Sequence, residues 1–167
     1  FLCLKTFSQN YSEEIVLQEI LNIWKIFNDE NVRYITIGGL AVNIYGYTRN
    51  TGDIDILIED SVENRINLRV AFKKIGIGDF PQIETMQFVA GYTDFTISYD
   101  LRLDVMTSIK GLEQVNFDVL HQNATIVLLQ EIPVYFIDYD NLMIAKKATN
   151  RLKDQLDIEE LNKLNKK

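Results

Sequence analysis

The chain contains 167 residues, of which 47% are hydrophobic, and this length and composition predict one domain with a substantial core. Its 24 acidic and 17 basic side chains give a formal net charge of −7, so the chain is a poor general binder of nucleic-acid backbones. No apolar run approaches the roughly 18 residues needed to cross a bilayer, and the single cysteine excludes an intrachain disulfide and a thiolate metal cluster.

The first predicted element is a helix over residues 12–28, which is followed by a strand at 33–37. The helix is indicated by a broad apolar face at helical spacing: Ile15, Leu17, Ile20, Leu21, Ile23, Trp24 and Phe27. Gly38-Gly39 ends the strand, and a helix at 39–46 comes next. A strand, a glycine turn and a helix N-terminus leave backbone N–H groups that favour an anion, so this turn is a candidate phosphate site.

Thirteen residues after the glycines, Asp53-Ile54-Asp55-Ile56 begins a strand predicted at 53–59. Side chains two apart in a strand share a face, so both carboxylates lie on the face opposite to the isoleucines. Two carboxylates that close repel each other unless a cation lies between them. Mg²⁺ prefers one or two carboxylates plus phosphate oxygens, and the pair is therefore a candidate metal site beside the glycine turn.

A helix is predicted at 62–74 and a β-rich stretch at about 83–107, with strands at 85–90, 95–99 and 101–108. In the last strand apolar and polar residues alternate, so that Asp104 projects from the face opposite to the core. Two metal ions that activate an attacking oxygen and stabilise a leaving one need a third carboxylate, and Asp104 is the candidate.

After Gly111 the sequence predicts a short irregular or helical piece and then four elements: strands at 124–129 and 133–137 and helices at 139–149 and 153–165. The fold class is α+β, with a mixed β-sheet flanked by helices and an acidic site at one edge of the sheet.

The whole chain, 1–167, is predicted to be one domain. It divides into an N-terminal helix (1–30), a catalytic core (31–137) and C-terminal helices (138–167). Residues 1–137 carry 10 basic and 18 acidic side chains, whereas 138–167 carry 7 and 6, so only the C-terminal part is slightly positive.

These motifs resemble the nucleotidyltransferase superfamily that includes DNA polymerase beta. That superfamily is marked by Gly-Gly or Gly-Ser, a gap of about nine to thirteen residues, and Asp-hydrophobic-Asp-hydrophobic. More narrowly, the chain is similar to small bacterial nucleotidyltransferases related to AbiEii-type toxins. The similarity covers nearly the whole chain and rests on these residues: Gly38-Gly39-Leu40-Ala41-Val42, Tyr45-Gly46, Arg49, Thr51, Asp53-Ile54-Asp55, Lys146 to Asp154, and Asp157.

Two positions depart from the pattern of that group. Gly39 stands where many members have serine, which removes a hydroxyl that could contact phosphate. Asn150 stands where related sequences often have glycine, although asparagine tolerates a left-handed turn better than most residues. Neither change abolishes the site.

The resemblance implies transfer of a nucleoside monophosphate from an NTP to an acceptor hydroxyl, with release of pyrophosphate. Asp53 and Asp55 would hold Mg²⁺ or Mn²⁺, and Gly38 and Gly39 would seat the triphosphate. Asp104 would complete a second metal site or accept the proton of the attacking hydroxyl.

The C-terminal segment supplies cations for the same reaction. Lys146 could pair with the β- or γ-phosphate, and Arg151 could do so bidentately. Asp154 is either catalytic or a carboxylate that stabilises the last helix. If the acceptor is RNA, we expect local contacts from the basic side chains near the site: Arg49, Lys146, Lys147, Arg151 and Lys153.

Several residues near the site have an alternative structural interpretation. Arg49 and Thr51 either contact the nucleotide or fix the loop before the Asp53 strand. Tyr45 and Tyr47 lie close enough to the glycine turn to stack on a base. His121 is expected at the surface or at a helix end, because no second His or Cys stands near it.

Two other functions would fit these motifs. The same constellation could transfer a γ-phosphoryl group, as a kinase-like relative would, or the chain could be a catalytically silent binding module. Three retained, mutually repelling acids argue against the silent module. The expected partners are an NTP, an acceptor that is a tRNA, a protein or a small molecule, and an antitoxin-like protein. The first seven residues are too short and interrupted for a signal peptide, and a start at Phe1 suggests that preceding residues are missing, so we expect a cytoplasmic location without membrane contact.

Overall fold

The structure is a computed structural model that describes residues 11–98 and 101–165, with side chains of the first helix from Val16 onward. Its elements follow the chain in this order: α1 (Tyr11–Asp29), β1 (Tyr34–Thr36), α2 (Gly38–Ile44), β2 (Asp53–Ile58), α3 (Val62–Ile75), the 3₁₀ helix η2 (Pro81–Glu84), β3 (Asp94–Ser98), β4 (Leu101–Met106), α4 (Phe117–Gln122), β5 (Thr125–Leu129), β6 (Ile132–Phe136), α5 (Tyr139–Thr149) and α6 (Leu152–Asn165).

The six strands form one mixed sheet in the order β3-β4-β2-β1-β6-β5. β2 pairs parallel with β4 and β1 pairs parallel with β6, whereas the other neighbours are antiparallel. A mixed α+β fold is therefore confirmed. The expectation that the acidic site lies at an edge of the sheet is wrong, because β3 pairs with β4 and leaves both acidic strands in the interior.

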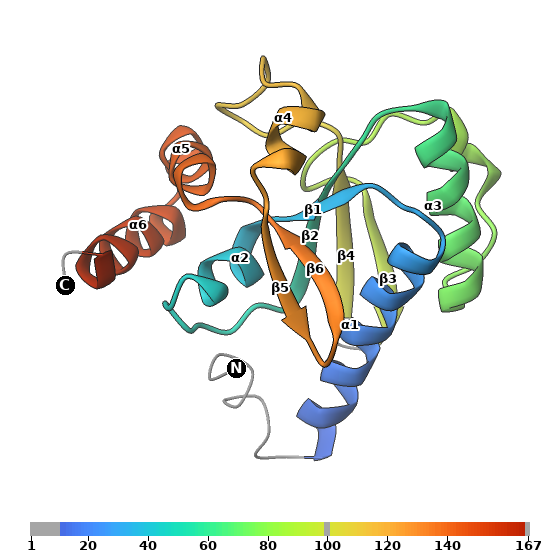
Figure 1. Cartoon of the computed structure of the whole chain (residues 1–167), viewed down its shortest axis with the longest axis horizontal. Helices are drawn as coiled ribbons and strands as arrows, with labels where there is room; N and C mark the ends of the chain where they lie inside the picture. Colours follow the sequence, from blue (N-terminus) through green and yellow to red (C-terminus); the bar gives the residue numbers. More distant parts are fainter. Residues whose placement is uncertain (1–10, 99–100, 166–167) are drawn as a thin grey trace.

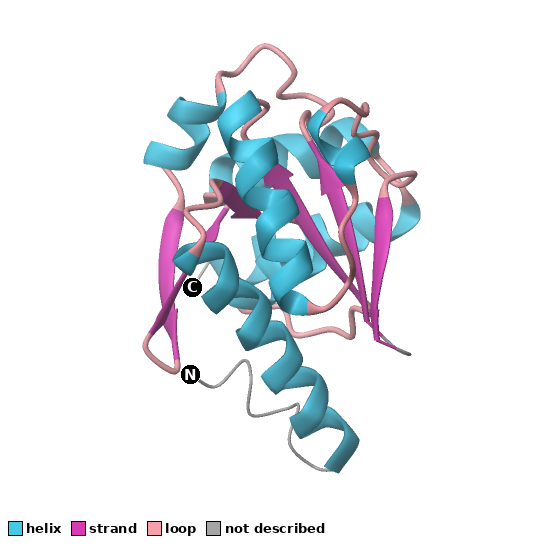
Figure 2. Cartoon of the chain, turned by 90° about the vertical axis from the view of Figure 1, so that its right-hand side faces the viewer, coloured by secondary structure: helices cyan, strands magenta, loops and turns pink. Residues whose placement is uncertain are grey.

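Helices lie on both sides of this sheet (Figures 1 and 2). Aromatic residues of α1 pack on the sheet, with Phe27 edge-on to Tyr34 and Trp24 edge-on to Phe136. Phe72 of α3 packs in the same manner on Phe95 of β3. Figure 1 shows α5 and α6 side by side at the opposite end of the molecule from α3. This arrangement leaves the aspartate face of β2 and β4 beside the C-terminal helices.

The strand predicted at 85–90 is absent, and this part of the prediction is wrong. The chain forms η2 and then a loop, because the Arg65 guanidinium on α3 donates to the carbonyl oxygens of Ile83 and Met86 at 2.9 and 2.7 Å. Phe88, one of the apolar residues that suggested a strand, is buried under the same guanidinium. Tyr99, the end of the next predicted strand, lies outside the described residues.

Local sequence signals set the ends of α3 and α5. The Ser61 hydroxyl accepts a hydrogen bond from the Asn64 N–H at the start of α3, and Gly76 ends that helix with φ of 95°. Asn150 ends α5 in the left-handed conformation, with φ of 53°, which confirms its expected tolerance of that turn. Within the described part of the chain, every helix is too short or too polar to cross a membrane.

Candidate active site

The pairing of β2 with β4 brings the three predicted carboxylates to one place. Asp55 and Asp104 are Cα partners in this parallel pair, and Asp53 lies two residues before Asp55 on the same face of β2. Ile54 and Ile56 are buried on the opposite face, so the alternation predicted from the sequence is confirmed. Three acidic side chains from two separate strands therefore share one small surface.

The glycine turn closes directly over Asp55. Gly38 has φ of 64°, and a Cβ atom there would lie 1.9 Å from Asp55 Oδ2. The Gly39 N–H donates to the Asp55 carboxylate, and the Ile37 N–H donates to the Asp55 carbonyl at 2.9 Å. Glycine at position 38 is thus required by close approach of a carboxylate, and the anion at the turn in this structure is Asp55 itself.

Burial and mutual repulsion perturb two of the carboxylates. Burial raises the pKa of Asp55, and the charge of Asp53 raises it further, while the Gly39 N–H and the charges of Lys146 and Lys153 oppose the increase. Burial likewise raises the pKa of Asp104 to about 6, with added repulsion from its acidic neighbours. Deprotonating both groups near neutral pH therefore concentrates negative charge that a cation would relieve.

The donor set fits a hard divalent cation that is bound in part by substrate. Asp104 Oδ2 accepts from the Gly91 N–H at 2.9 Å, whereas its buried Oδ1 has no partner among the described residues. Within the described part, no group of three or more His, Cys, Asp or Glu side chains is arranged so that it could hold a metal ion. Mg²⁺ commonly takes one or two carboxylates and completes its shell with water and phosphate, so Asp53 and Asp55 satisfy that requirement without a preformed cage.

A cavity of about 410 Å³ lies over these carboxylates. The ten residues predicted to act in catalysis, metal binding or nucleotide binding line it: Gly38, Gly39, Arg49, Thr51, Asp53, Asp55, Asp104, Lys146, Arg151 and Lys153. These residues come from the first turn of α2, the loop before β2, strands β2 and β4, and the C-terminal helices with the turn that joins them. The tertiary structure thus brings together every one of them. Lys147, Tyr45 and Tyr47, which were expected to contact RNA or a base, do not line it.

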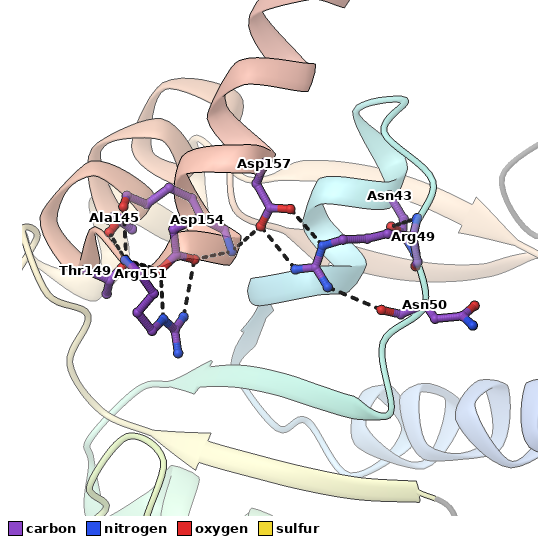
Figure 3. A network of polar contacts seen from close by, with 9 residues as sticks. Asn43, Arg49, Asn50, Ala145, Thr149, Arg151, Asp154 and Asp157 are labelled. Atoms are coloured by element: carbon purple, nitrogen blue, oxygen red, sulfur yellow. Dashed lines mark hydrogen bonds and ion pairs between the residues drawn. The ribbon is translucent and has the colours of Figure 1, made fainter.

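The cationic side chains of the C-terminal helices have different surroundings. Lys146 is buried, and its Nζ lies 2.9 Å from Asp154 Oδ1 and 2.8 Å from Asp157 Oδ2. Arg151 is 59% exposed and its Nε donates to Asp154 Oδ2 at 2.7 Å (Figure 3). Lys153 is exposed at the cavity. Direct contact of Lys146 with phosphate, which stays a prediction, would require it to leave two buried carboxylates.

The turn at Asn150 explains why the two carboxylates reach Lys146. The left-handed residue, whose N–H donates to the Lys146 carbonyl at 3.0 Å, lets α6 fold back against α5. Asp154 and Asp157 are three residues apart on α6, so both face α5. Burial alone would raise the pKa of Asp154, but hydrogen bonds from Arg151, Lys146 and Thr149 hold this pKa well below its usual range.

Comparisons with known proteins bear on the fold. No protein-family model matches the chain, and no curated protein matches it by sequence. The solution structure of the antibiotic-resistance factor ANT(2'')-Ia is similar with a TM-score of 0.55 at 18% identity, over 89% of this chain and 82% of that chain. The chain has a nucleotidyltransferase-like fold. A crystal structure of ANT(2'')-Ia in complex with adenylyl-2''-tobramycin aligns at a TM-score of 0.48 and 15% identity, over 86% of this chain and 95% of that chain.

Three aromatic residues considered in the sequence analysis make structural contacts. The Tyr45 hydroxyl donates to the Ile137 carbonyl at 2.8 Å and contacts Thr125, while its ring packs edge-on against Tyr139. Tyr47 is partly buried against the core. The Tyr45 hydroxyl is thus used inside the protein and the residue does not line the cavity, so stacking of a base on Tyr45 stays a prediction. His121 lies at the end of α4, as expected for a helix-end residue. Its ring stacks on that of Tyr135, with 4.7 Å between the two ring centroids.

Sequence reasoning missed one wall of the cavity. Ser108, Ile109 and Lys110, just after β4, line it. The Leu112 N–H donates to the Ile109 carbonyl at 3.0 Å and closes a turn in which Gly111 has φ of 87°. A Cβ atom on Gly111 would lie 2.7 Å from the Ala148 Cβ of α5, so this glycine docks the turn on α5 and holds Lys110 at the cavity. The sequence signal that could have indicated this turn is the isolated Gly111, which follows the strand that carries Asp104.

Proposed function

We propose that this chain is a metal-dependent nucleotidyltransferase that moves a nucleoside monophosphate from an NTP to an acceptor hydroxyl and releases pyrophosphate. The observation that carries the proposal is the cavity in which Asp55 of β2 and Asp104 of β4 lie side by side, beneath the Gly38-Gly39 turn. The nucleotidyltransferase-like fold, which the chain shares with the solution structure of ANT(2'')-Ia, supports it.

The carboxylates have separate tasks in this proposal. Asp53 and Asp55 would hold Mg²⁺ or Mn²⁺, which when bound supplies a compact positive charge for the phosphate oxygens. Asp104 would accept the proton of the acceptor hydroxyl at its buried, unpartnered Oδ1, for which a pKa of about 6 is well suited near neutral pH. The acceptor oxygen forms a bond to the α-phosphorus as the bond to the β-phosphate oxygen breaks.

The triphosphate would lie along the glycine turn, beside Arg49 and Thr51, which both line the cavity. Lys153 and Arg151 are the exposed cations on the α6 side and would offset the charge that builds on departing pyrophosphate. Lys146 would act from its buried position, since its charge opposes the increase in the pKa of Asp55.

The test uses Mg²⁺ and NTPs labelled separately at the α- and γ-phosphates, with tRNA, total protein and small hydroxylated molecules as acceptors. Transfer of the α label with release of pyrophosphate is the expected result. Transfer of the γ label would replace the proposal by phosphoryl transfer from the same site, and no transfer to any acceptor would favour a binding module. Asp53→Asn/Asp55→Asn must abolish turnover, whereas Asp29→Asn, an exposed aspartate on α1, must not.

The toxin-like role is a finer part of the proposal and rests on the sequence resemblance. It predicts that expression of the chain arrests bacterial growth, and that Asp53→Asn/Asp55→Asn relieves the arrest. Growth arrest that persists in this variant would separate the toxicity from the transferase site.

A further inference from the structure

Asp157 of α6 binds two cations that come from different parts of the chain. Its side chain is 1% exposed, and its two oxygens accept from Arg49 Nε and Nη2 at 2.8 and 3.1 Å. Oδ2 also lies 2.8 Å from Lys146 Nζ. Figure 3 shows the Asp157 carboxylate facing the Arg49 guanidinium across the space between α6 and the loop before β2.

Arg49 is held from a second side as well. Its backbone N–H donates to Asn43 Oδ1 at 3.0 Å, and the Asn43 side-chain amide donates to the Arg49 carbonyl at 2.9 Å. This reciprocal pair fixes the backbone of Arg49 on α2, while Asp157 fixes the guanidinium from α6. The position of the guanidinium therefore depends on both helices.

The fixed guanidinium faces the glycine turn. Arg49 Nη1 lies 3.1 Å from the position that a Cβ atom of Gly39 would take, and Arg49 lines the cavity. A guanidinium has five N–H groups, of which two go to Asp157 and one makes a 3.3 Å contact with the Asn50 carbonyl. Two N–H groups remain without a partner among the described residues and can meet an anion at the turn.

We infer that Asp157 is a positioning residue, which aims the Arg49 guanidinium at the phosphates of the NTP and holds Lys146 back from them. This inference deepens the proposed function and rests on it. A bidentate carboxylate fixes the plane of a guanidinium, so the free N–H groups on its other side point in one direction.

The charge of the cluster separates positioning from simple attraction. Arg49, Lys146 and Arg151 face Asp154 and Asp157, so three cations meet two carboxylates and one positive charge is left over. Asp157→Asn increases that excess. If charge alone mattered, the variant would bind NTP more tightly; if positioning matters, it binds NTP more weakly despite the added positive charge.

The experiment compares Asp157→Asn, Arg49→Lys and their double variant in steady-state kinetics. We expect each single variant to raise KM for the NTP on the order of ten-fold with a smaller change in kcat, and the double variant to be no worse than either. Arg49→Lys keeps the charge but loses the fork that binds Asp157. Glu159→Gln, which removes an exposed carboxylate on the same helix, is the matched control and should leave KM unchanged.

Binding of a non-hydrolysable NTP analogue with Mg²⁺ gives a second measurement that needs no acceptor. It distinguishes a failure of this inference from a failure of the proposed function, since wild-type binding without turnover would remove only the latter. An unchanged or lower KM and Kd in Asp157→Asn, or additive losses in the double variant, would overturn the positioning role. If Asp157→Asn does not fold, as judged by circular dichroism, the test rests on Arg49→Lys. Arg49 is partly exposed and lysine keeps its positive charge, so this variant is expected to fold.

Discussion

Asp55 and Asp104 are direct partners in the parallel pairing of β2 and β4, and neither carboxylate forms an ion pair with a cation among the described residues. Lys146, whose charge reaches Asp55, is itself bound by two other carboxylates. Repulsion between Asp55 and Asp104 should therefore lower the free energy of unfolding when no metal ion is bound.

Asp104→Asn should stabilise the metal-free protein at alkaline pH. The pKa of Asp104 is raised from 3.8 to about 6, so its contribution to stability is full below pH 4 and is lost as pH rises through about 6. The variant lacks this loss, and after allowance for solvent screening the gain at pH 8 should be on the order of 1–2 kcal/mol. Urea unfolding in EDTA at pH 4, 6 and 8 measures it. A gain that is equal at all three pH values would contradict the explanation.

Gly38→Ala should destabilise the protein strongly. The new methyl group would collide with Asp55 Oδ2 and would occupy a left-handed backbone position, so a loss on the order of 2–4 kcal/mol is expected. Gly52→Ala is the matched control, because a Cβ atom there meets nothing within 4 Å. Thermal unfolding of both variants checks this, and equal losses would show that the contact with Asp55 is not the cause.

Gly39→Ser should destabilise the protein. A Cβ atom at 39 would lie 2.7 Å from the Thr51 hydroxyl, so in this chain Thr51 occupies the space of that side chain. We expect a loss on the order of 1–3 kcal/mol that Thr51→Gly partly restores. A double-mutant cycle on unfolding free energies is the measurement, and strict additivity would exclude the steric account.

Asp154→Ala should cost about 3–5 kcal/mol, because it leaves Lys146 buried with one carboxylate fewer and frees Arg151 and Thr149. The depressed pKa of Asp154 means that its stabilising effect is present above the ordinary aspartate pKa of about 4 and is lost only as pH falls towards the lower folded value. Urea titrations at pH 7 and pH 3 should thus both show the loss. Glu160→Gln on the same helix, where the carboxylate is more exposed, should change stability by less than about 0.5 kcal/mol.

Lys110→Ala should weaken NTP binding by roughly three- to ten-fold, since this exposed cation is held at the cavity by the turn that Gly111 docks on α5. The effect should shrink as salt is raised, because exposed charges are screened. Lys25→Ala, an exposed lysine on α1, provides the comparison. Titration of an NTP analogue at low and high salt measures both, and an equal response of the two variants would remove Lys110 from the site.

Where chemistry is local, the sequence was enough to predict the structure. The alternation of Asp53 and Asp55 with Ile54 and Ile56 determines which side chains face the cavity, because a strand has a period of two. The left-handed conformation of Asn150 agrees with the tolerance of asparagine for such a turn, although the expectation of a turn there came from the family resemblance. The local signals failed at 85–90, where the Met86 carbonyl, which a strand would pair with another strand, accepts a hydrogen bond from Arg65 of α3.

Three features were decided only by tertiary structure, because each depends on contacts between distant segments. The parallel pairing that sets Asp104 beside Asp55 joins strands separated by α3, η2 and β3, and no pattern within either strand specifies its partner. The turn of Lys110 depends on the close approach of Gly111 to α5. The carboxylates that surround Lys146 and Arg49 come from a helix that folds back on the site. The sequence by itself determined which chemical groups the site contains; packing between distant segments decided which charges are already paired and which remain for a substrate.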